Sequence, residues 1–373
     1  MQKIGILGGG QLGKMLCLAA ANWDLDIFVM DTEGCAAQAY CKQFIAGDFR
    51  LYEDVMRFGL MVDVLTIEIE HVNTEALKAL ESLGKTVHPN PHSLALIKDK
   101  GLQKAFYFDN KIPTSKVFYF ENKEKLKEKV FYPSVWKSRK GGYDGKGVAI
   151  LNNPKDVEIL PDEPCILEEM IDIEKEIAVL VCRNADGQIK AYPSVEMIFD
   201  PKANLLDYQI CPALISDDVE QKAQNLAKEL IKILNICGLL AVEMFLTKSG
   251  QLLVNEVAPR PHNSGHHTIE ALETSQFEQH LRGILNLPLG STAIRLPSVL
   301  LNLVGAEGYV GEMRVEGLEK ALNTEGVHLH LYGKKITKPF RKMGHATILN
   351  KSAETALKNA TFLKNNVKII SNE

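Results

Sequence analysis

A glycine-rich turn near the amino terminus constrains the fold of this chain more than any other feature. An apolar run at 3–7 stops at Gly8-x-Gly10-x-x-Gly13, a helix-like segment follows at 14–21, and a second apolar run at 26–30 ends at Asp31. This order predicts a β–loop–α–β unit, the start of an α/β domain with a parallel sheet. Such a turn binds a nicotinamide cofactor or another phosphorylated ligand in some proteins and only serves packing in others, so all three interpretations stay open.

Length and composition set further bounds. A chain of 373 residues exceeds one ordinary core, and its formal charge of −4 argues against a general nucleic-acid binder. Seven scattered cysteines without a C-x-x-C pair indicate neither a disulfide framework nor a cysteine-rich zinc site. The amino terminus lacks a basic signal-peptide flank, and no apolar run approaches the roughly 18 residues of a membrane span. We therefore expect a reduced cytoplasmic protein that binds neither nucleic acid nor membranes.

The pattern along the chain predicts three parts. Strand-like and helix-like runs alternate up to a proline-bounded segment at 89–91, which follows the short strand expected at 86–88. The middle part has a glycine-rich hairpin between strand-like runs at 134–138 and 146–151, more strands at 165–168 and 176–182, and a helix at 219–234. After residue 297 the chain is β-rich again and closes with a helix near 353–363. We expect breaks near residues 95 and 297.

Two acids flank a predicted β-hairpin in the middle part. Apolar runs at 239–247 and 251–257 surround Lys248-Ser249-Gly250. If Ser249-Gly250 is a two-residue turn, Glu243 lies opposite Glu256 at a Cβ separation of ~5 Å, where like charges destabilise a strand pair unless a cation such as Mg²⁺ binds them. If the loop has three residues, Asn255 faces Glu243 and Glu256 points away. An exposed hairpin with two solvated acids is the simpler alternative.

A second glycine loop contains four glycines among the seven residues 141–147. Basic residues at 137, 139, 140 and 146 surround it, and it lacks the Walker pattern. Free backbone N–H groups and positive charge suit a lid over a polyphosphate, whereas a solvated hairpin tip is the alternative. Tyr143 and Asp144 at its centre favour a functional lid. The segment 166–171 and Glu176 could offer backbone groups to an adenine edge and a carboxylate to a ribose hydroxyl, although by themselves an ordinary buried strand is the better explanation.

Two polar clusters follow. Arg260 and His262 precede His266 and His267 in a loop without nearby cysteines, which favours hydrogen bonding, anion binding or proton transfer over zinc binding. Five basic residues lie between 334 and 342, either as a solvated loop or as a phosphate site. Phe340 is the one aromatic residue among them, so an RNA-binding surface is weakly supported.

Together these motifs resemble the ATP-grasp superfamily, and within it the N5-carboxyaminoimidazole ribonucleotide synthetase family of purine biosynthesis. The similarity spans nearly the whole chain and keeps its order: the turn at 8–13, Thr66-Ile67-Glu68-Ile69-Glu70, the loop 141–147, Glu243, and the segments 255–267 and 332–345. It implies an ATP-grasp fold of mixed α/β and α+β class. The implied domains are a Rossmann-like preATP-grasp domain at 1–97, an ATP-grasp domain at 98–297 with a mobile lid at about 115–180, and a small β-rich domain at 298–373.

The resemblance also implies an activity. The family carboxylates 5-aminoimidazole ribonucleotide with ATP and bicarbonate through carboxyphosphate, releasing ADP and phosphate, with Mg²⁺, or Mn²⁺ in its place, as the metal. A homodimer is a further family-level expectation.

The resemblance assigns roles to individual residues. Catalysis would involve Tyr143, Asp144, Arg260, His262 and Lys342, with Asp144 as a candidate base. Glu243 and Glu256 would hold the metal with Asn255. The second substrate would contact Gln11, Leu12, Glu68, Glu70, Lys334, Arg341 and Lys342. ATP would contact Lys100, Lys137, Gly142, Tyr143, Asp144, Gly145, Lys146, Gly147, Val148, Glu168, Glu169, Met170, Ile171, Glu176, Asn255 and Glu256.

Two positions depart from the family pattern. Phe199 falls where many relatives place a nucleotide-contacting histidine, and Lys100 replaces a common arginine, which keeps the charge but loses bidentate geometry. Three alternatives remain: a sibling ATP-grasp ligase such as a formate-dependent glycinamide ribonucleotide transformylase, a nicotinamide-dependent dehydrogenase, and a non-catalytic nucleotide- or RNA-binding module. The dehydrogenase leaves Glu243, Glu256 and the second glycine loop unexplained.

Overall fold

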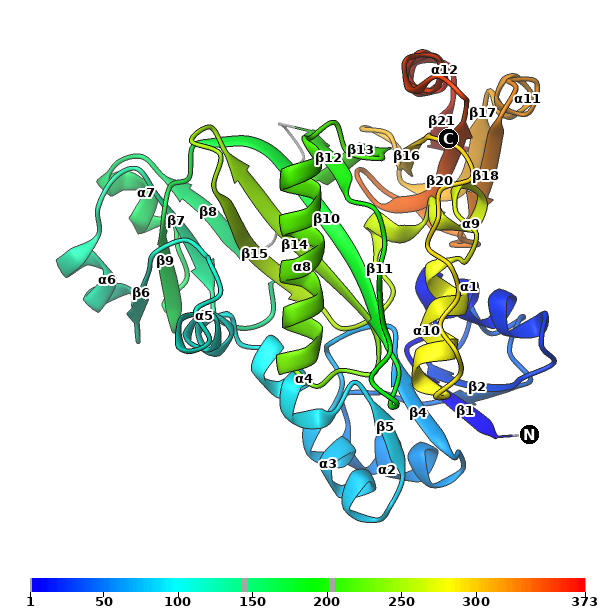
Figure 1. Cartoon of the computed structure of the whole chain (residues 1–373), viewed down its shortest axis with the longest axis horizontal. Helices are drawn as coiled ribbons and strands as arrows, with labels where there is room; N and C mark the ends of the chain where they lie inside the picture. The colour runs from blue at the N-terminus through cyan, green and yellow to red at the C-terminus, as the bar shows by residue number, and fades with distance from the viewer. Residues whose placement is uncertain (1, 143–146, 201–204, 373) are drawn as a thin grey trace.

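The structure, a computed structural model, describes residues 2–142, 147–200 and 205–372. Figure 1 shows an amino-terminal sheet with its helices, a long central sheet, a small separate sheet at one end and a carboxy-terminal part at the other. Among the described residues, no helix is both long and apolar enough to cross a bilayer.

The amino-terminal part is a five-stranded parallel sheet in the order β3-β2-β1-β4-β5, which confirms the predicted Rossmann-like α/β architecture. Apolar strands buried on both faces need helices on both sides. Helices α2 and α3 cover one face, whereas α1 and the distant helix α10 cover the other. The elements are β1 (Lys3–Leu7), α1 (Gln11–Ala21), β2 (Asp26–Asp31), β3 (Gln43–Ala46), α2 (Tyr52–Leu60), β4 (Val64–Ile67), α3 (Thr74–Ser82), β5 (Thr86–His88) and α4 (Pro91–Ile97).

The central sheet has nine strands and continues into the carboxy-terminal part without a break. Its order is β15-β14-β10-β12-β13-β16-β20-β18, with β11 paired to β10, and all its described pairs are antiparallel. Its central-domain elements are β10 (Ile173–Arg183), β11 (Ile189–Ala191), β12 (Val195–Asp200), β13 (Leu205–Cys211), α8 (Asp217–Ile233), β14 (Gly238–Thr247), β15 (Leu252–Ala258), the 3₁₀ helix η1 (Asn263–Gly265), α9 (Thr268–Ala271) and α10 (Gln276–Ile284).

Helix α8 shows why the sequence folds this way. The Ser216 side chain accepts a hydrogen bond from the Val219 N–H at the helix start, where three acids also lie. Four apolar side chains at helical spacing, Ala223, Ala227, Leu230 and Ile231, are buried in the core shared with β10 and β14. The helix therefore covers one face of the central sheet, as Figure 1 shows.

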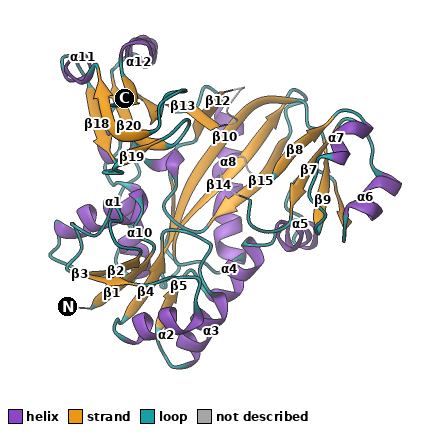
Figure 2. Cartoon of the chain, turned by 180° about the vertical axis from the view of Figure 1, so that it is seen from behind, coloured by secondary structure: helices purple, strands orange, loops and turns teal. Residues whose placement is uncertain are grey.

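A four-stranded antiparallel sheet, β6-β9-β7-β8, forms the small unit at the far end from the carboxy terminus (Figures 1 and 2). Its elements, with the helix that leads into it, are α5 (Lys100–Asp109), β6 (Val117–Phe120), α6 (Lys123–Lys129), β7 (Ser134–Ser138), β8 (Val148–Leu151), α7 (Pro154–Glu158) and β9 (Cys165–Glu169). The second glycine loop connects β7 to β8, and its residues Tyr143, Asp144, Gly145 and Lys146 lie outside the described residues.

The carboxy-terminal part adds strands to the central sheet and builds a three-stranded sheet, β19-β17-β21. Its elements are β16 (Ser298–Val304), β17 (Gly311–Glu316), α11 (Leu318–Leu322), β18 (Val327–Leu331), β19 (Ile336–Thr337), β20 (Lys342–Leu349), α12 (Ala353–Asn366) and β21 (Lys368–Ser371). This is the small β-rich domain that the sequence predicts.

Candidate active site

The hairpin β14–β15 resolves the ambiguity in turn length. Leu246 pairs with Leu252, and the Thr247 N–H donates to the Gln251 carbonyl oxygen at 2.9 Å, so the loop has three residues and ends in Gly250 at a positive φ of 79°. By strand alternation alone this loop would place Asn255 opposite Glu243. A β-bulge at Asn255 shifts the register by one residue, and Glu243 pairs with Glu256 after all.

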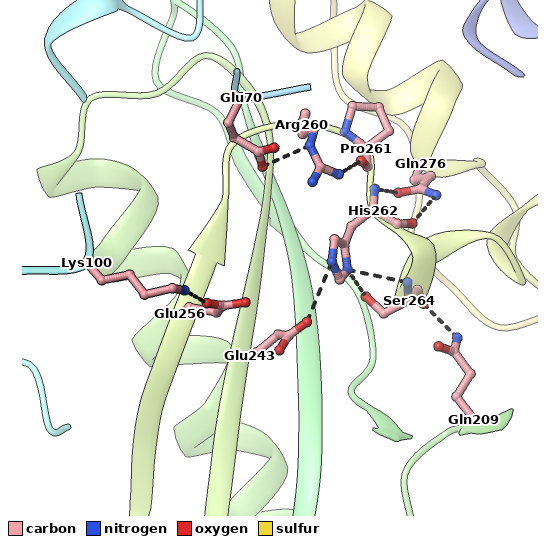
Figure 3. Close-up of polar contacts among 10 residues, drawn as sticks. All are labelled: Glu70, Lys100, Gln209, Glu243, Glu256, Arg260, Pro261, His262, Ser264 and Gln276. Atoms are coloured by element: carbon pink, nitrogen blue, oxygen red, sulfur yellow. Dashed lines mark hydrogen bonds and ion pairs between the residues drawn. The ribbon is translucent and has the colours of Figure 1, made fainter. Parts of the chain in front are cut away.

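The two carboxylates therefore come from neighbouring strands, as Figure 3 shows, but differ in their electrostatic surroundings. Burial and the nearby Glu256 raise the pKa of Glu243. The Lys100 ammonium, which pairs with Glu256, lowers the pKa of Glu256. The pair holds one proton more readily than either acid would alone, as expected for close carboxylates.

A buried charge network joins this hairpin to the four-stranded sheet. Lys137 Nζ lies 2.9 Å from Asn255 Oδ1 and 3.0 Å from Glu168 Oε1, and Lys104 Nζ lies 3.4 Å from Glu168 Oε2. Burial opposes ionisation of Glu168, but Lys137 and Lys104 outweigh it and lower its pKa. Burial lowers the pKa of Lys104 to about 8. The Glu168 carboxylate thus pairs with two buried lysines, Lys104 and Lys137. The remaining positive charge would attract a polyphosphate.

Glu176 on β10 completes this side of the site. Burial raises its pKa to about 7, and its carboxylate is close enough to contribute to the raised pKa of Glu243. Val148 opens β8 and pairs with Lys137. Glu169 ends β9 and Met170 is exposed just after it.

Arg260 and His262 lie in the loop that follows β15, above the carboxylate pair in Figure 3. Arg260 Nε is 2.9 Å from Glu70 Oε1, and His262 Nε2 is 3.6 Å from Glu243 Oε1. The other ring nitrogen, His262 Nδ1, is 2.9 Å from Ser264 Oγ. The fold therefore gathers residues from three distant segments around one point.

Glu68 has a structural task at the first glycine turn. Its carboxylate accepts the N–H groups of Gly10, at 3.1 Å, and Gly13, at 3.0 Å, at the amino terminus of α1. Burial raises the pKa of Glu68, although these two hydrogen bonds lower it in part. The N–H groups that would hold a dinucleotide pyrophosphate are thus already used by the protein itself, which argues against the dehydrogenase alternative.

The expected second-substrate residues are only partly gathered. Lys334 Nζ donates to Gln11 Oε1 and to the Lys342 carbonyl oxygen, both at 2.7 Å, which joins the carboxy-terminal part to the glycine turn. Lys342 is close enough to lower the pKa of Glu243 in part. Arg341 instead donates to the Ile336 carbonyl oxygen, and the Leu12 side chain packs in the core at 8% exposure.

Three functional candidates escaped sequence reasoning: Lys104, Ser115 and Gln276. Ser115 Oγ donates to Glu168 Oε2 at 2.7 Å, and Gln276 holds the backbone of His262. No local motif marks these residues, because their polar partners lie far away in the chain. Phe199, at the position where relatives place a nucleotide-contacting histidine, sits on β12 beside a register shift and packs against the core that includes Met197 and Leu206.

Three protein-family models match consecutive parts of the chain: the ribonucleotide synthetase preATP-grasp domain over 1–98, the ATP-grasp domain over 105–277, and the phosphoribosylaminoimidazole carboxylase C-terminal domain over 298–359. The N5-carboxyaminoimidazole ribonucleotide synthase of Bacillus subtilis is 36% identical over 372 residues, which cover 96% of this chain and 94% of that protein. The chain belongs to the N5-carboxyaminoimidazole ribonucleotide synthetase family.

Solved structures of the family agree with this assignment. The enzyme from Thermotoga maritima superposes with a TM-score of 0.93 at 44% identity and covers 100% of both chains. The Aspergillus clavatus enzyme in complex with ADP and 5-aminoimidazole ribonucleotide gives a TM-score of 0.90 at 32% identity over 98% of each chain.

The phosphoribosylaminoimidazole carboxylase of Ogataea methanolica is 38% identical, and the chain spans 67% of its length. The family is one of ATP-grasp ligases, so the predicted fold and enzyme class are confirmed.

The residues at the hairpin fit a hard divalent cation. Glu243 and Glu256 offer carboxylate oxygens from a like-charge pair, and Asn255, whose Oδ1 accepts a hydrogen bond from Lys137, offers an amide oxygen next to Glu256. Within the described residues, no three histidine, cysteine, aspartate or glutamate side chains are arranged to hold an ion. Two carboxylates and one amide oxygen suit Mg²⁺, which usually binds one or two carboxylates and completes its shell with water and substrate phosphates.

Proposed function

We propose that this chain carboxylates 5-aminoimidazole ribonucleotide with ATP and bicarbonate, giving N5-carboxyaminoimidazole ribonucleotide, ADP and phosphate. One observation carries the proposal: the Glu243–Glu256 pair adjoins both the lysine-rich network under the four-stranded sheet and the Arg260–His262 loop that faces the amino-terminal domain. A polyphosphate and a second substrate would meet at this point. Membership of the family identifies the polyphosphate as ATP and the second substrate as 5-aminoimidazole ribonucleotide in this proposal.

Each group has a task in this mechanism. Lys137 and Lys100 would neutralise the ATP phosphates, and Glu243 and Glu256, with Asn255, would hold Mg²⁺ or Mn²⁺, which neutralises charge as the γ-phosphoryl group transfers. Arg260 and His262 would orient bicarbonate and the carboxyphosphate formed from it. Carboxyphosphate is labile in water, so the loop that includes Gly142 and Gly147 would close over the site.

The imidazole ribonucleotide would bind on the opposite side. Gln11 and Lys334 meet at the junction of the amino-terminal and carboxy-terminal parts, and Glu70 pairs with Arg260. These residues and the rest of the segment 334–342 would bind this substrate. The attacking amine loses a proton to a base, for which Asp144 of the lid is our candidate. An Asp144→Asn variant that kept full bicarbonate-dependent turnover would remove it from that role.

The decisive experiment measures phosphate release with ATP and Mg²⁺ while substrates are added in turn. Turnover should require bicarbonate and 5-aminoimidazole ribonucleotide together. Formate with glycinamide ribonucleotide serves as the control for the sibling ligase, and turnover with that pair alone would refute the proposal. The homodimer and the cytoplasmic location stay predictions, which light scattering on the purified protein and cell fractionation test.

A further inference from the structure

A single glutamine side chain holds the backbone of His262. Gln276 Oε1 accepts the His262 N–H at 2.8 Å, and Gln276 Nε2 donates to the His262 carbonyl oxygen at 2.7 Å (Figure 3). The side-chain amide thus pairs with His262 as a neighbouring strand would. His262 lies in a loop after β15, beyond the sheet ladder, so the amide replaces hydrogen bonds that regular structure would otherwise supply.

Burial, hydrogen bonds and close packing hold the Gln276 side chain in place. It is fully buried at the first turn of α10, and its own N–H donates to Thr268 Oγ1 at 2.8 Å. Its Nε2 lies 3.1 Å from His266 Nδ1. A Cβ added at Gly265 would lie 2.3 Å from Gln276 Oε1, so the loop packs directly against the amide. These contacts fix the position of the Gln276 side chain, and its two hydrogen bonds in turn fix the backbone of His262.

The same amide connects the loop to the carboxy-terminal part. The His266 ring stacks on His345 of β20 at 4.7 Å between centroids, and His345 stacks on His330 of β18 at 4.5 Å. The Tyr332 hydroxyl lies 3.0 Å from His345 Nδ1. Strand β20 also begins with Lys342. Gln276 therefore joins His262 to the element that carries another expected substrate residue.

We propose that Gln276 is the positioning residue of His262: it holds the imidazole over Glu243 without contacting a substrate. The inference rests on the proposed function, because it assigns a reaction to the residue that Gln276 positions. Loss of the amide would let the His262 backbone move while the lysines and carboxylates of the nucleotide side stay in place. Small displacements of a catalytic group cost up to roughly a hundredfold in rate.

The chain offers a matched control on the same helix. Gln279 is also fully buried, accepts the Gly290 N–H at 2.8 Å and donates to the Gly290 carbonyl oxygen at 3.1 Å. It makes the same two-bond clamp on a loop that carries none of the expected site residues. Gln276→Leu and Gln279→Leu therefore each remove two hydrogen bonds to a loop backbone, and Gln276→Leu also removes the contact with His266 Nδ1. Only Gln276→Leu should affect the reaction.

The experiment compares kcat and the KM for ATP in wild type and both leucine variants. We expect Gln276→Leu to lower kcat by about a hundredfold with an unchanged KM for ATP, and Gln279→Leu to lose similar thermal stability but keep kcat. Equal kcat values in the two variants would overturn the proposal. Failure of the wild type to turn over would instead refute the proposed function, so the two failures are distinguishable.

A second variant covers the case in which Gln276→Leu fails to fold. In Gln276→Glu the introduced carboxyl can replace both amide bonds only while it is protonated, and burial favours that form. We expect its kcat, relative to the wild type, to fall as pH rises, and a ratio independent of pH would overturn the proposal. The ratio cancels titration of the surrounding groups, which are present in both proteins: His262, His266, Glu243, Glu278, His330, Lys342 and His345.

Discussion

The carboxylate pair Glu243–Glu256 at the hairpin predicts that the affinity for a divalent metal ion depends on pH near neutrality, well above the pH at which ordinary carboxylates titrate. Burial and Glu256 raise the pKa of Glu243, whereas Lys100 lowers the pKa of Glu256. Near neutral pH the shared proton therefore resides on Glu243. A divalent cation binds ionised carboxylates, so its binding must release that proton.

The magnitude follows from this proton release. Below the raised pKa of Glu243, a metal ion that displaces one proton binds about tenfold more tightly for each pH unit, which is about 1.4 kcal/mol. Above that pKa the affinity becomes constant. If Glu243 instead titrated at the ordinary value near 4.3, the affinity would be flat from about pH 6 upward.

The assay uses Mn²⁺ as a paramagnetic probe with ADP present, over a pH series from about 6 to 8, in wild type and Glu243→Gln. The glutamine keeps the shape of the side chain but carries no proton to displace, and the titration of ADP itself is common to both proteins. We expect a steep pH slope for the wild type and weaker binding with a shallower slope for Glu243→Gln. Equal slopes in the two proteins would refute the argument.

Three further predictions concern neighbouring residues. Burial raises the pKa of Glu176 to about 7 from a reference of 4.5, so between these values the folded state binds this proton more strongly than the unfolded state. The free energy of unfolding of the wild type should therefore fall as pH rises from about 4.5 to about 7, and urea unfolding of Glu176→Gln should lack that part of the loss. Gly265→Ala should destabilise the fold by about 1–3 kcal/mol in the same assay, because its Cβ would overlap the Gln276 side chain; unchanged stability would contradict the packing. Glu70→Gln removes a carboxylate that we propose contacts 5-aminoimidazole ribonucleotide and that pairs with Arg260, so the KM for this substrate should rise by about tenfold and the KM for ATP should not, whereas equal effects on both would argue against this placement.

Local patterns in the sequence were sufficient for much of the fold. The turn at Gly8–Gly13 predicts a parallel sheet because strand, turn and helix follow one another within a few residues. The hairpin at 248–250 was equally visible, but its alternatives could not be separated. Alternation along a strand fixes which side chains share a face only if no residue is inserted, and the bulge at Asn255 is such an insertion.

The remaining parts of the site depend on contacts between distant segments. Glu68 was expected to face the second substrate, yet its carboxylate binds N–H groups 55 and 58 residues away in the chain. Gln276 likewise reads as an ordinary polar residue at a helix start until the fold brings it to His262. Roles of this kind require tertiary structure, because the partner determines the role.

The continuous hydrogen-bonded ladder from β15 to β18 has a mechanical consequence. Because β13 pairs with β16, the carboxy-terminal strands and the β14–β15 hairpin belong to one continuous sheet, and bending between them would break backbone hydrogen bonds. We therefore expect opening and closing of the site to come from movement of the separate four-stranded sheet relative to the central sheet. A chimaera that exchanges the carboxy-terminal part between relatives must cut this ladder, and a chain shortened before β16 would expose the edge of β13 to aggregation.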